Sequence, residues 1–378
     1  MNILFLSVFK GINGNLTLLV LDKRSDRVIA FEKTVKNSSI LDPTRNFEEI
    51  IRTFEYRTDP LTRRNTTVIK GMMEYVSKFL VSDDVLLKSL IEKTRVNCPF
   101  CPENVESKTP MFSENFVKGG RIFVGNIVVV PNFLGHAERS IVVVLSKEHH
   151  LKLNDFTSKM VFDGFKGGVT YLRRLREVKP SINFPAFIFN YMPPAGSSML
   201  HPHVQVLVRD RPFYLVRLLL EKSKAYFESN GSSYWADLLE KERNGERYVF
   251  GKNDVEWLVP FAPLRGINEA QAIVRGKSNL LEMTNKEWLE LAEGTAKILQ
   301  YYHKEGYISF NIILMSGPVN EHLDYFDVNL RIMSRPGIQA FGFTDAWALP
   351  YLLWDGEAVE EPELFAQRLR AFVSSSQG

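Results

Sequence analysis

Cysteine is scarce in this chain. Its 378 residues include two cysteines, and they lie close together as Cys98-Pro99-Phe100-Cys101. One such pair excludes the network of disulfide bonds on which small secreted domains depend. We therefore expect a cytoplasmic protein whose cysteines serve another purpose.

An excess of charge of one sign is also missing. The 47 basic and 44 acidic residues leave a formal net charge of +3, and they are spread along the chain without the basic cluster that marks a nucleic-acid binder. Near the start, Lys10 and Gly11 interrupt the apolar runs of Met1–Val20, which argues against a signal segment or a membrane span. We expect neither nucleic acid nor a membrane as a partner.

The composition that remains is that of a globular protein, with 45% hydrophobic residues in a chain long enough for one large core or two ordinary ones. At the start, short β-forming runs alternate with turn residues and predict a β meander. Its strands are expected at Asn2–Val8, Leu16–Asp22 and Arg27–Thr34.

A pattern of strands and a long helix follows. Valine-rich runs predict central strands at Arg121–Val130 and Ser140–Ser146. Apolar residues at helical spacing then predict a long helix over Leu153–Val178. Two further strands are expected at Ala186–Asn190 and His201–Val208.

After Arg211 this order recurs loosely, which hints at a duplicated domain. Thr284-Asn285-Lys286-Glu287 is a capping box that opens a helix ending near Gly306. The remaining elements are expected as helices at Phe213–Phe227, Tyr234–Arg243 and Pro362–Phe372, and as strands at Tyr248–Val259, Ala270–Val274, Tyr307–Met315 and Phe326–Met333.

The segment His201-Pro202-His203-Val204-Gln205 concentrates chemistry on one surface. In an extended strand, residues two apart project to the same side. An imidazole can act as nucleophile, base or metal ligand, and the preceding Ala195–Ser198 loop offers backbone N–H groups and hydroxyls to phosphate oxygens. The combination indicates phosphate-ester chemistry, whereas a bare His-x-His pair is more often a packed or metal-only feature.

The two cysteines predict a structural zinc site. Zinc prefers four thiolate and imidazole ligands in tetrahedral geometry, and Cys98, Cys101, His201 and one of His149 or His150 can supply them. The alternatives are a free, reduced pair or a redox Cys-x-x-Cys motif, which needs a thioredoxin-like βαβ setting that the sequence lacks.

Three stretches resemble the galactose-1-phosphate uridylyltransferase family, a nucleotidyl-transferring branch of the histidine-triad (HIT) superfamily. They are Arg57–Thr62, Cys98–Cys101 and Asn190–Gln205. The resemblance implies an α+β fold with two HIT-like domains, each a mostly antiparallel sheet packed with helices, preceded by the N-terminal β meander. The expected ranges are 1–50 for the meander, 51–210 for a catalytic domain and 211–378 for a second, degenerate domain.

The resemblance also implies roles for individual residues. His203 would attack the α-phosphorus of a nucleoside diphosphate sugar to give a nucleotidyl-histidine, and Gln205 would hold a phosphoryl oxygen. The implied zinc ligands are Cys98, Cys101, His149 and His201. The implied phosphate- and nucleotide-binding residues are Arg57, Asn190, Gly196, Ser197 and Ser198. The acceptor would be a sugar 1-phosphate, the pathway carbohydrate metabolism and the assembly a homodimer.

Two departures from the family's pattern bear on the acceptor. Asn329-Leu330-Arg331 stands where the family can carry a second metal-binding His-x-His, and the segment from Ile338 to Pro350 lacks the family's hexose-contacting lysine. One alternative is therefore a phosphorylase that transfers the nucleotide of an ADP-sugar or a dinucleoside polyphosphate to inorganic phosphate. Another is a non-catalytic, zinc-stabilised nucleotide-binding protein.

Overall fold

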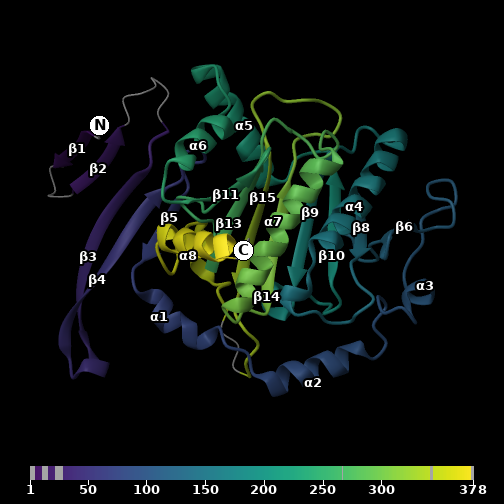
Figure 1. The fold of residues 1–378 in the computed structure, drawn as a ribbon, viewed down its shortest axis with the longest axis horizontal. Helices are drawn as coiled ribbons and strands as arrows, with labels where there is room; N and C mark the ends of the chain where they lie inside the picture. The colour runs from purple at the N-terminus through teal and green to yellow at the C-terminus, as the bar shows by residue number, and fades with distance from the viewer. Residues whose placement is uncertain (1–4, 11–15, 22–28, 266, 341–343, 376–378) are drawn as a thin grey trace.

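The computed structural model describes residues 5–10, 16–21, 29–265, 267–340 and 344–375 (Figure 1). It is an α+β protein with a six-stranded sheet and a ten-stranded sheet, which confirms the expected fold class. The ends of the meander strands expected at residues 2–4, at residue 22 and at residues 27–28 lie outside the described residues. Among the residues described, no helix has the length and apolar character needed to cross a bilayer.

The N-terminal meander forms most of the six-stranded sheet, which lies at the left of Figure 1. Five of its strands follow one another along the chain, and the sixth, β16, pairs in parallel with β5 from near the C-terminus. The expected boundary at residue 50 falls inside β4. The strands are β1 Phe5–Lys10, β2 Leu16–Leu21, β3 Glu32–Asp42, β4 Glu48–Thr58, β5 Asn65–Ile69 and β16 Gly356–Ala358.

The ten-stranded sheet is antiparallel throughout and consists of two halves with the same topology. Along the chain, each half contributes three strands, one long helix and two more strands. The halves join where β9 pairs with β14. The first half contains β6 Ile122–Val124, β7 Ile127–Pro131, β8 Arg139–Val144, β9 Phe184–Tyr191 and β10 His203–Arg209. The second half contains β11 Tyr248–Lys252, β12 Val255–Leu258, β13 Ile267–Val274, β14 Ser309–Met315 and β15 Val328–Arg335.

Two expected strands are each divided into a hairpin. The run expected at Tyr248–Val259 forms β11 and β12, which pair with each other, and the second case is at the start of the large sheet. The run Arg121–Val130 forms β6 and β7, which pair through Val124 and Ile127 across a two-residue turn. Gly125 in that turn has φ of +58°, a left-handed conformation that suits a tight hairpin and that glycine adopts without strain. In the strand order, β6 is the edge strand and β7 lies between it and β8. The expected central strand is thus a hairpin at the edge of the sheet.

The two long helices, α4 Ser158–Val178 and α7 Asn285–Lys304, pack on one face of the large sheet (Figure 1). The capping box predicted at Thr284 and Glu287 is present at the start of α7. Opposite them, α5 and α6 contact the other face over the second half. The other helices are α1 Met72–Val76, α2 Asp84–Arg95, α3 Val105–Lys108, α5 Tyr214–Asn230, α6 Tyr234–Arg243 and α8 Pro362–Ser375.

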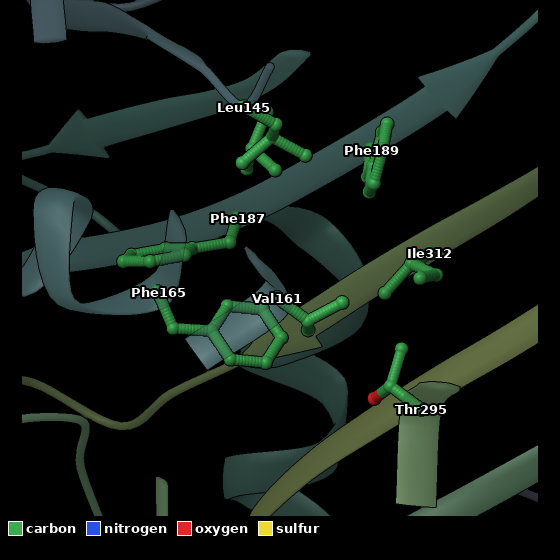
Figure 2. Close-up of a pocket in the computed structure, with 8 residues that line it drawn as sticks. Leu145, Val161, Phe165, Phe187, Phe189, Thr295 and Ile312 are labelled. Carbon is green, nitrogen blue, oxygen red and sulfur yellow. The ribbon is translucent and has the colours of Figure 1, made fainter. Parts of the chain in front are cut away.

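The core between the sheet and the long helices is tightly packed. A Cβ added at Gly168 of α4 would lie 2.5 Å from the ring of Phe187, so only glycine lets the helix approach this closely. A cavity of about 10 Å³ remains between Leu145, Phe165 and Phe187, and the Thr295 hydroxyl is the polar group drawn at its wall in Figure 2. A space of that size is a packing defect rather than a substrate site.

Candidate functional site

Side chains of β10 alternate between the core and the opposite, outer face of the sheet. Val204, Val206 and Val208 pack in the core, so His203 and Gln205 project to the outer face. The strand begins at His203, and His201 precedes it. Strand alternation therefore holds for His203 and Gln205, whereas His201 is placed by the loop before the strand.

His203 is held as a neutral imidazole with one nitrogen available. Its Nδ1 lies 2.9 Å from the backbone oxygen of His201, so Nδ1 carries the proton and Nε2 carries the lone pair. Burial lowers the pKa of His203, although the hydrogen bond to His201 opposes that shift. No acceptor or donor from the described residues occupies Nε2, and the Phe100 ring packs against the imidazole at 5.3 Å between centroids.

The loop between β9 and β10 is conformationally strained. Met192 has φ of 72° and ψ of 158°, a region that only glycine normally occupies. Gly196 follows at φ of 80°, after the short turn Pro193–Ala195. The Ser197 hydroxyl donates to Met199 O at 2.6 Å, whereas Ser198 is exposed. Of the two serines, Ser198 thus has the side chain that faces solvent.

Asn190 lies on the outer face near His203. Gln205 pairs with Ile188 across β10 and β9, so two residues further along the antiparallel strands Asn190 lies level with His203. The Asn190 Oδ1 accepts a hydrogen bond of 2.6 Å from Asn311 of the second half. The structure therefore gathers His203, Gln205, Asn190 and the serine-bearing loop on one surface.

The predicted metal ligands also come together. The ligand atoms of Cys98, Cys101, His149 and His201 all lie within 4.8 Å of one another, and all four residues are buried. The Cys101 Sγ is 3.6 Å from Nδ1 of His149 and 3.7 Å from Nδ1 of His201. Ligand atoms about 2.0–2.3 Å from a tetrahedral zinc lie roughly 3.3–3.8 Å apart, so these two separations fit such an ion.

The surroundings of this Cys2His2 cluster prepare both imidazoles to bind through Nδ1. His201 Nε2 lies 2.8 Å from Ser146 O, and His149 Nε2 lies 3.0 Å from Thr94 Oγ1. Such partners fix the tautomer and orientation of metal-binding histidines. Burial and the neighbouring Cys98 raise the pKa of the Cys101 thiol to about 12, so a cation is needed to stabilise its thiolate.

The structure distinguishes between the two adjacent histidines. His149 belongs to the cluster, whereas the His150 ring stacks on Tyr191 at 6.3 Å between centroids. His150 therefore offers a nearby imidazole outside the Cys2His2 cluster, which can serve as a control for substitutions at His149 and His203.

Arg57 is not brought to this surface and requires a correction. It is 1% exposed, and its guanidinium makes five hydrogen bonds, two to Glu55, two to Glu363 and one to Phe261 O. A guanidinium has five N–H donors, so none remains for a phosphate. We therefore remove Arg57 from the expected phosphate-binding group. Its contacts with Glu55 and Glu363 instead connect the N-terminal sheet to α8.

Sequence reasoning missed three residues that support the site. Thr94 orients His149, Phe100 packs on the rings of His201 and His203, and Asn311 contacts Asn190. Asn311 alone had a signal in the sequence, since it is a polar residue inside the otherwise apolar strand Phe310–Met315. The other two depend on contacts between distant segments.

Solved structures of three related kinds share this fold. An ADP-glucose phosphorylase from Arabidopsis thaliana with bound ADP-glucose has a TM-score of 0.64 at 18% identity, over 84% of this chain and 98% of that chain. A uridylyltransferase has a TM-score of 0.64 at 21% identity, over 85% and 99%. A GalT-like protein from Arabidopsis thaliana has a TM-score of 0.61 at 19% identity, over 84% and 98%.

At these identities the likeness shows the fold, which is the one that the resemblance implied. An uncharacterised protein of Archaeoglobus fulgidus is 29% identical over 345 residues, which cover 91% of this chain and 99% of the relative. No family model matches the chain.

Proposed function

We propose that this protein is a nucleotidyltransferase in which His203 Nε2 attacks the α-phosphorus of a nucleoside diphosphate sugar. The observation that carries the proposal is the hydrogen bond from His203 Nδ1 to His201 O at 2.9 Å. It leaves the lone pair on Nε2, and the low pKa of the buried ring keeps it neutral at physiological pH. A neutral imidazole is a competent nucleophile toward phosphorus.

The reaction takes place in two in-line steps. In the first, a bond forms between Nε2 and the α-phosphorus while the bond from that phosphorus to the bridging oxygen breaks, and the sugar 1-phosphate leaves. In the second, a phosphate oxygen of the acceptor attacks the same phosphorus and the nitrogen–phosphorus bond breaks. Because the enzyme returns to its starting state only after the second step, ping-pong kinetics are expected.

Other residues of the surface stabilise the phosphoryl group. The Gln205 amide projects to the same side of β10 as His203 and would donate to a non-bridging oxygen. Asn190, Gly196, Ser197 and Ser198 would contact the nucleotide and its phosphates, with Ser197 acting through the loop that it stabilises. A zinc ion held by Cys98, Cys101, His149 and His201 would stabilise the segments around His203.

The similarity of the fold to both uridylyltransferases and an ADP-glucose phosphorylase supports two acceptors, a hexose 1-phosphate and inorganic phosphate. The absence of a matching lysine between Ile338 and Pro350 favours inorganic phosphate. In that case the first step is unchanged and the product is a nucleoside diphosphate. A dinucleoside polyphosphate would serve as donor by the same chemistry.

The test is to incubate the purified protein with UDP-glucose or ADP-glucose labelled at the α-phosphorus and to measure an acid-labile, base-stable protein adduct. The base that gives label identifies the nucleotide, and chasing the adduct with phosphate or hexose 1-phosphates identifies the acceptor. His203→Asn is expected to abolish labelling with fold and metal content unchanged, while His150→Asn labels normally. Normal labelling of His203→Asn would remove the proposal, and no label in the wild type would favour a non-catalytic nucleotide-binding protein.

The homodimer implied by the resemblance is part of the proposal. Light scattering across a range of concentrations tests it independently of the labelling experiment.

A further inference from the structure

Three side chains form a continuous hydrogen-bonded chain from the second half of the sheet to the surface that carries His203. Arg335, at the end of β15, donates from Nη1 to Asn311 Oδ1 at 2.6 Å. Asn311 Nδ2 donates to Asn190 Oδ1 at 2.6 Å and to Ala195 O at 2.8 Å. The chain thus crosses the β14–β9 junction and reaches both β9 and the loop before β10.

The direction of these hydrogen bonds is determined by Arg335. A guanidinium has donors and no acceptor, so Asn311 must turn its carbonyl oxygen toward it. The Asn311 amide group then faces Asn190 and Ala195, and Asn190 must present its own carbonyl oxygen in return. The Asn190 amide group is left pointing away from Asn311, and no acceptor for it occurs in the part of the chain that the structure describes.

The far end of the chain is anchored. Asp345 forms an ion pair with Arg335, and the side chains are only 12% and 15% exposed. Asn311 is equally fixed, because both hydrogens of its amide group and one lone pair of its carbonyl are used. Because Arg335 and Asn311 have little freedom to rotate, they hold the Asn190 side chain in one orientation before substrate binds. Binding then costs little conformational entropy at Asn190.

We propose that Arg335 and Asn311 are positioning residues that orient the Asn190 amide as a donor to a phosphoryl oxygen of the nucleotide at His203. They also hold the Ala195 carbonyl, and with it the loop that carries Ser198. Donors arranged before the reaction stabilise charge that develops on phosphoryl oxygens. The inference rests on the proposed function and names residues of the second half that act through Asn190.

Asn311→Asp tests the direction of the chain. It keeps the size of the side chain and its contact with Arg335, but it places an oxygen against Asn190 Oδ1 and Ala195 O, so Asn190 must turn and present its carbonyl to the phosphate. We expect the labelling rate at saturating nucleotide sugar to fall roughly 10- to 100-fold. Nucleotide affinity, measured by calorimetry in the His203→Asn background, should change less than the rate.

A double-mutant cycle separates positioning from a general loss of structure. If Asn311 acts mainly through Asn190, Asn311→Asp should slow labelling much less in the Asn190→Ala background than in the wild type, and the remaining loss should reflect its second contact, with Ala195 O. Arg335→Met, which leaves Asn311 unchanged, gives an independent test should Asn311→Asp fold poorly. Arg335→Lys keeps the charge and should restore part of the rate lost in Arg335→Met. Arg331→Lys, on the same strand but paired with Glu269, is the control and should label at the wild-type rate per folded molecule.

The outcomes are distinct. A wild-type rate in Asn311→Asp, or additive losses in the cycle, overturns the positioning role while His203 still labels and the proposed function stands. Equal losses in Arg331→Lys and Arg335→Met also overturn it, since they would show that any buried arginine of β15 is required. No label in the wild type overturns the proposed function and the positioning role together.

Discussion

The two halves of the large sheet share one topology and differ in what covers the outer face. In the first half, β10 presents His203 and Gln205 on that face. In the second half, β15 takes the corresponding place in the strand order, but α5 and α6 pack over the outer face. The space left beside Arg331 there is about 30 Å³, room for water and far too little for a nucleotide. The same scaffold therefore leaves its outer face open in one half and buries it in the other, depending on the helices that follow.

The halves also differ in how they are held together. In the first half, four buried cysteine and histidine side chains that could hold a metal ion come together from separate segments. In the second half, Arg331 pairs with buried Glu269 at 2.6 Å. Glu363 of α8 pairs with Arg247 at 2.9 Å and with Arg57 of the N-terminal sheet at 2.8 Å. Metal ligation responds to chelators and thiol chemistry, whereas ion pairs respond to pH, so the two halves should fail under different conditions.

Removing a metal ligand should have the largest effect on stability. Cys98→Ala or His201→Ala should reduce bound zinc from about one per chain to near zero, because three ligands hold the ion weakly. We expect a loss of several kcal/mol, which lowers the melting temperature by roughly 5–10 °C. Metal analysis and calorimetry measure both quantities. His150→Ala is the matched control, and an unchanged zinc content in both ligand variants would contradict a metal site here.

Breaking the ion pair of the second half should come next. Arg331→Met leaves Glu269, which is 3% exposed, without its cation, and an uncompensated buried charge costs about 3–5 kcal/mol. Denaturant unfolding measures this loss. If the second half supports the structure without taking part in the chemistry, the folded fraction of Arg331→Met should still be labelled at His203 at the wild-type rate. A labelling defect per folded molecule would show that the second half takes part in the chemistry through Arg331.

Acid should weaken the ion pairs selectively. Burial raises the pKa of Glu363, but the hydrogen bonds and charges of Arg57 and Arg247 outweigh it and lower the pKa from 4.5 to about 2. Since the folded-state pKa lies below the unfolded value, the stabilisation is fully present above pH 4.5 and is lost as the pH falls toward 2. In Glu363→Gln, the free energy of unfolding should change less between pH 2 and 4.5, by on the order of 2 kcal/mol, because the substituted side chain does not titrate. Urea midpoints between pH 2 and 6 test this, and parallel curves for both proteins would argue against it.

The smallest expected difference lies at the starts of the two equivalent helices. Thr284 and Glu287 cap α7 reciprocally, with Glu287 accepting from Thr284 N at 2.6 Å, whereas Thr157 caps α4 by one bond to Met160 N at 3.2 Å. Thr284→Ala removes the cap and also the hydrogen bond from the Thr284 hydroxyl to Glu287, so it should cost about 1–2 kcal/mol, against about 0.5–1 kcal/mol for Thr157→Ala. Denaturation midpoints rank the two, and the reverse order would show that the hydroxyl's bond to Glu287 adds nothing.

Local pattern was enough to predict most elements of the fold. The apolar spacing of Leu153–Val178 predicted α4, although the helix begins at Ser158 and Leu153–Asp155 form a separate 3-10 turn. The capping box at Thr284 predicted the start of α7, and the recurrence after Arg211 matches the shared topology of the halves. These signals succeed because they depend on hydrogen bonds and side-chain periodicity within one element. The division of Arg121–Val130 was missed because a single positive φ at Gly125 decides it.

By itself the sequence determined which residue types were available for chemistry: the Cys-x-x-Cys pair, the histidines flanking Pro202, and the loop with Ser198. Only the tertiary structure decided which of them meet. It brought His149 rather than His150 to the cysteines, committed every donor of Arg57 to carboxylates and a carbonyl, and joined Arg335 and Asn311 to Asn190. The physical reason is that most of these contacts link residues between 24 and 306 positions apart, or choose between neighbours, and their geometry is set by how the strands of the sheet pair.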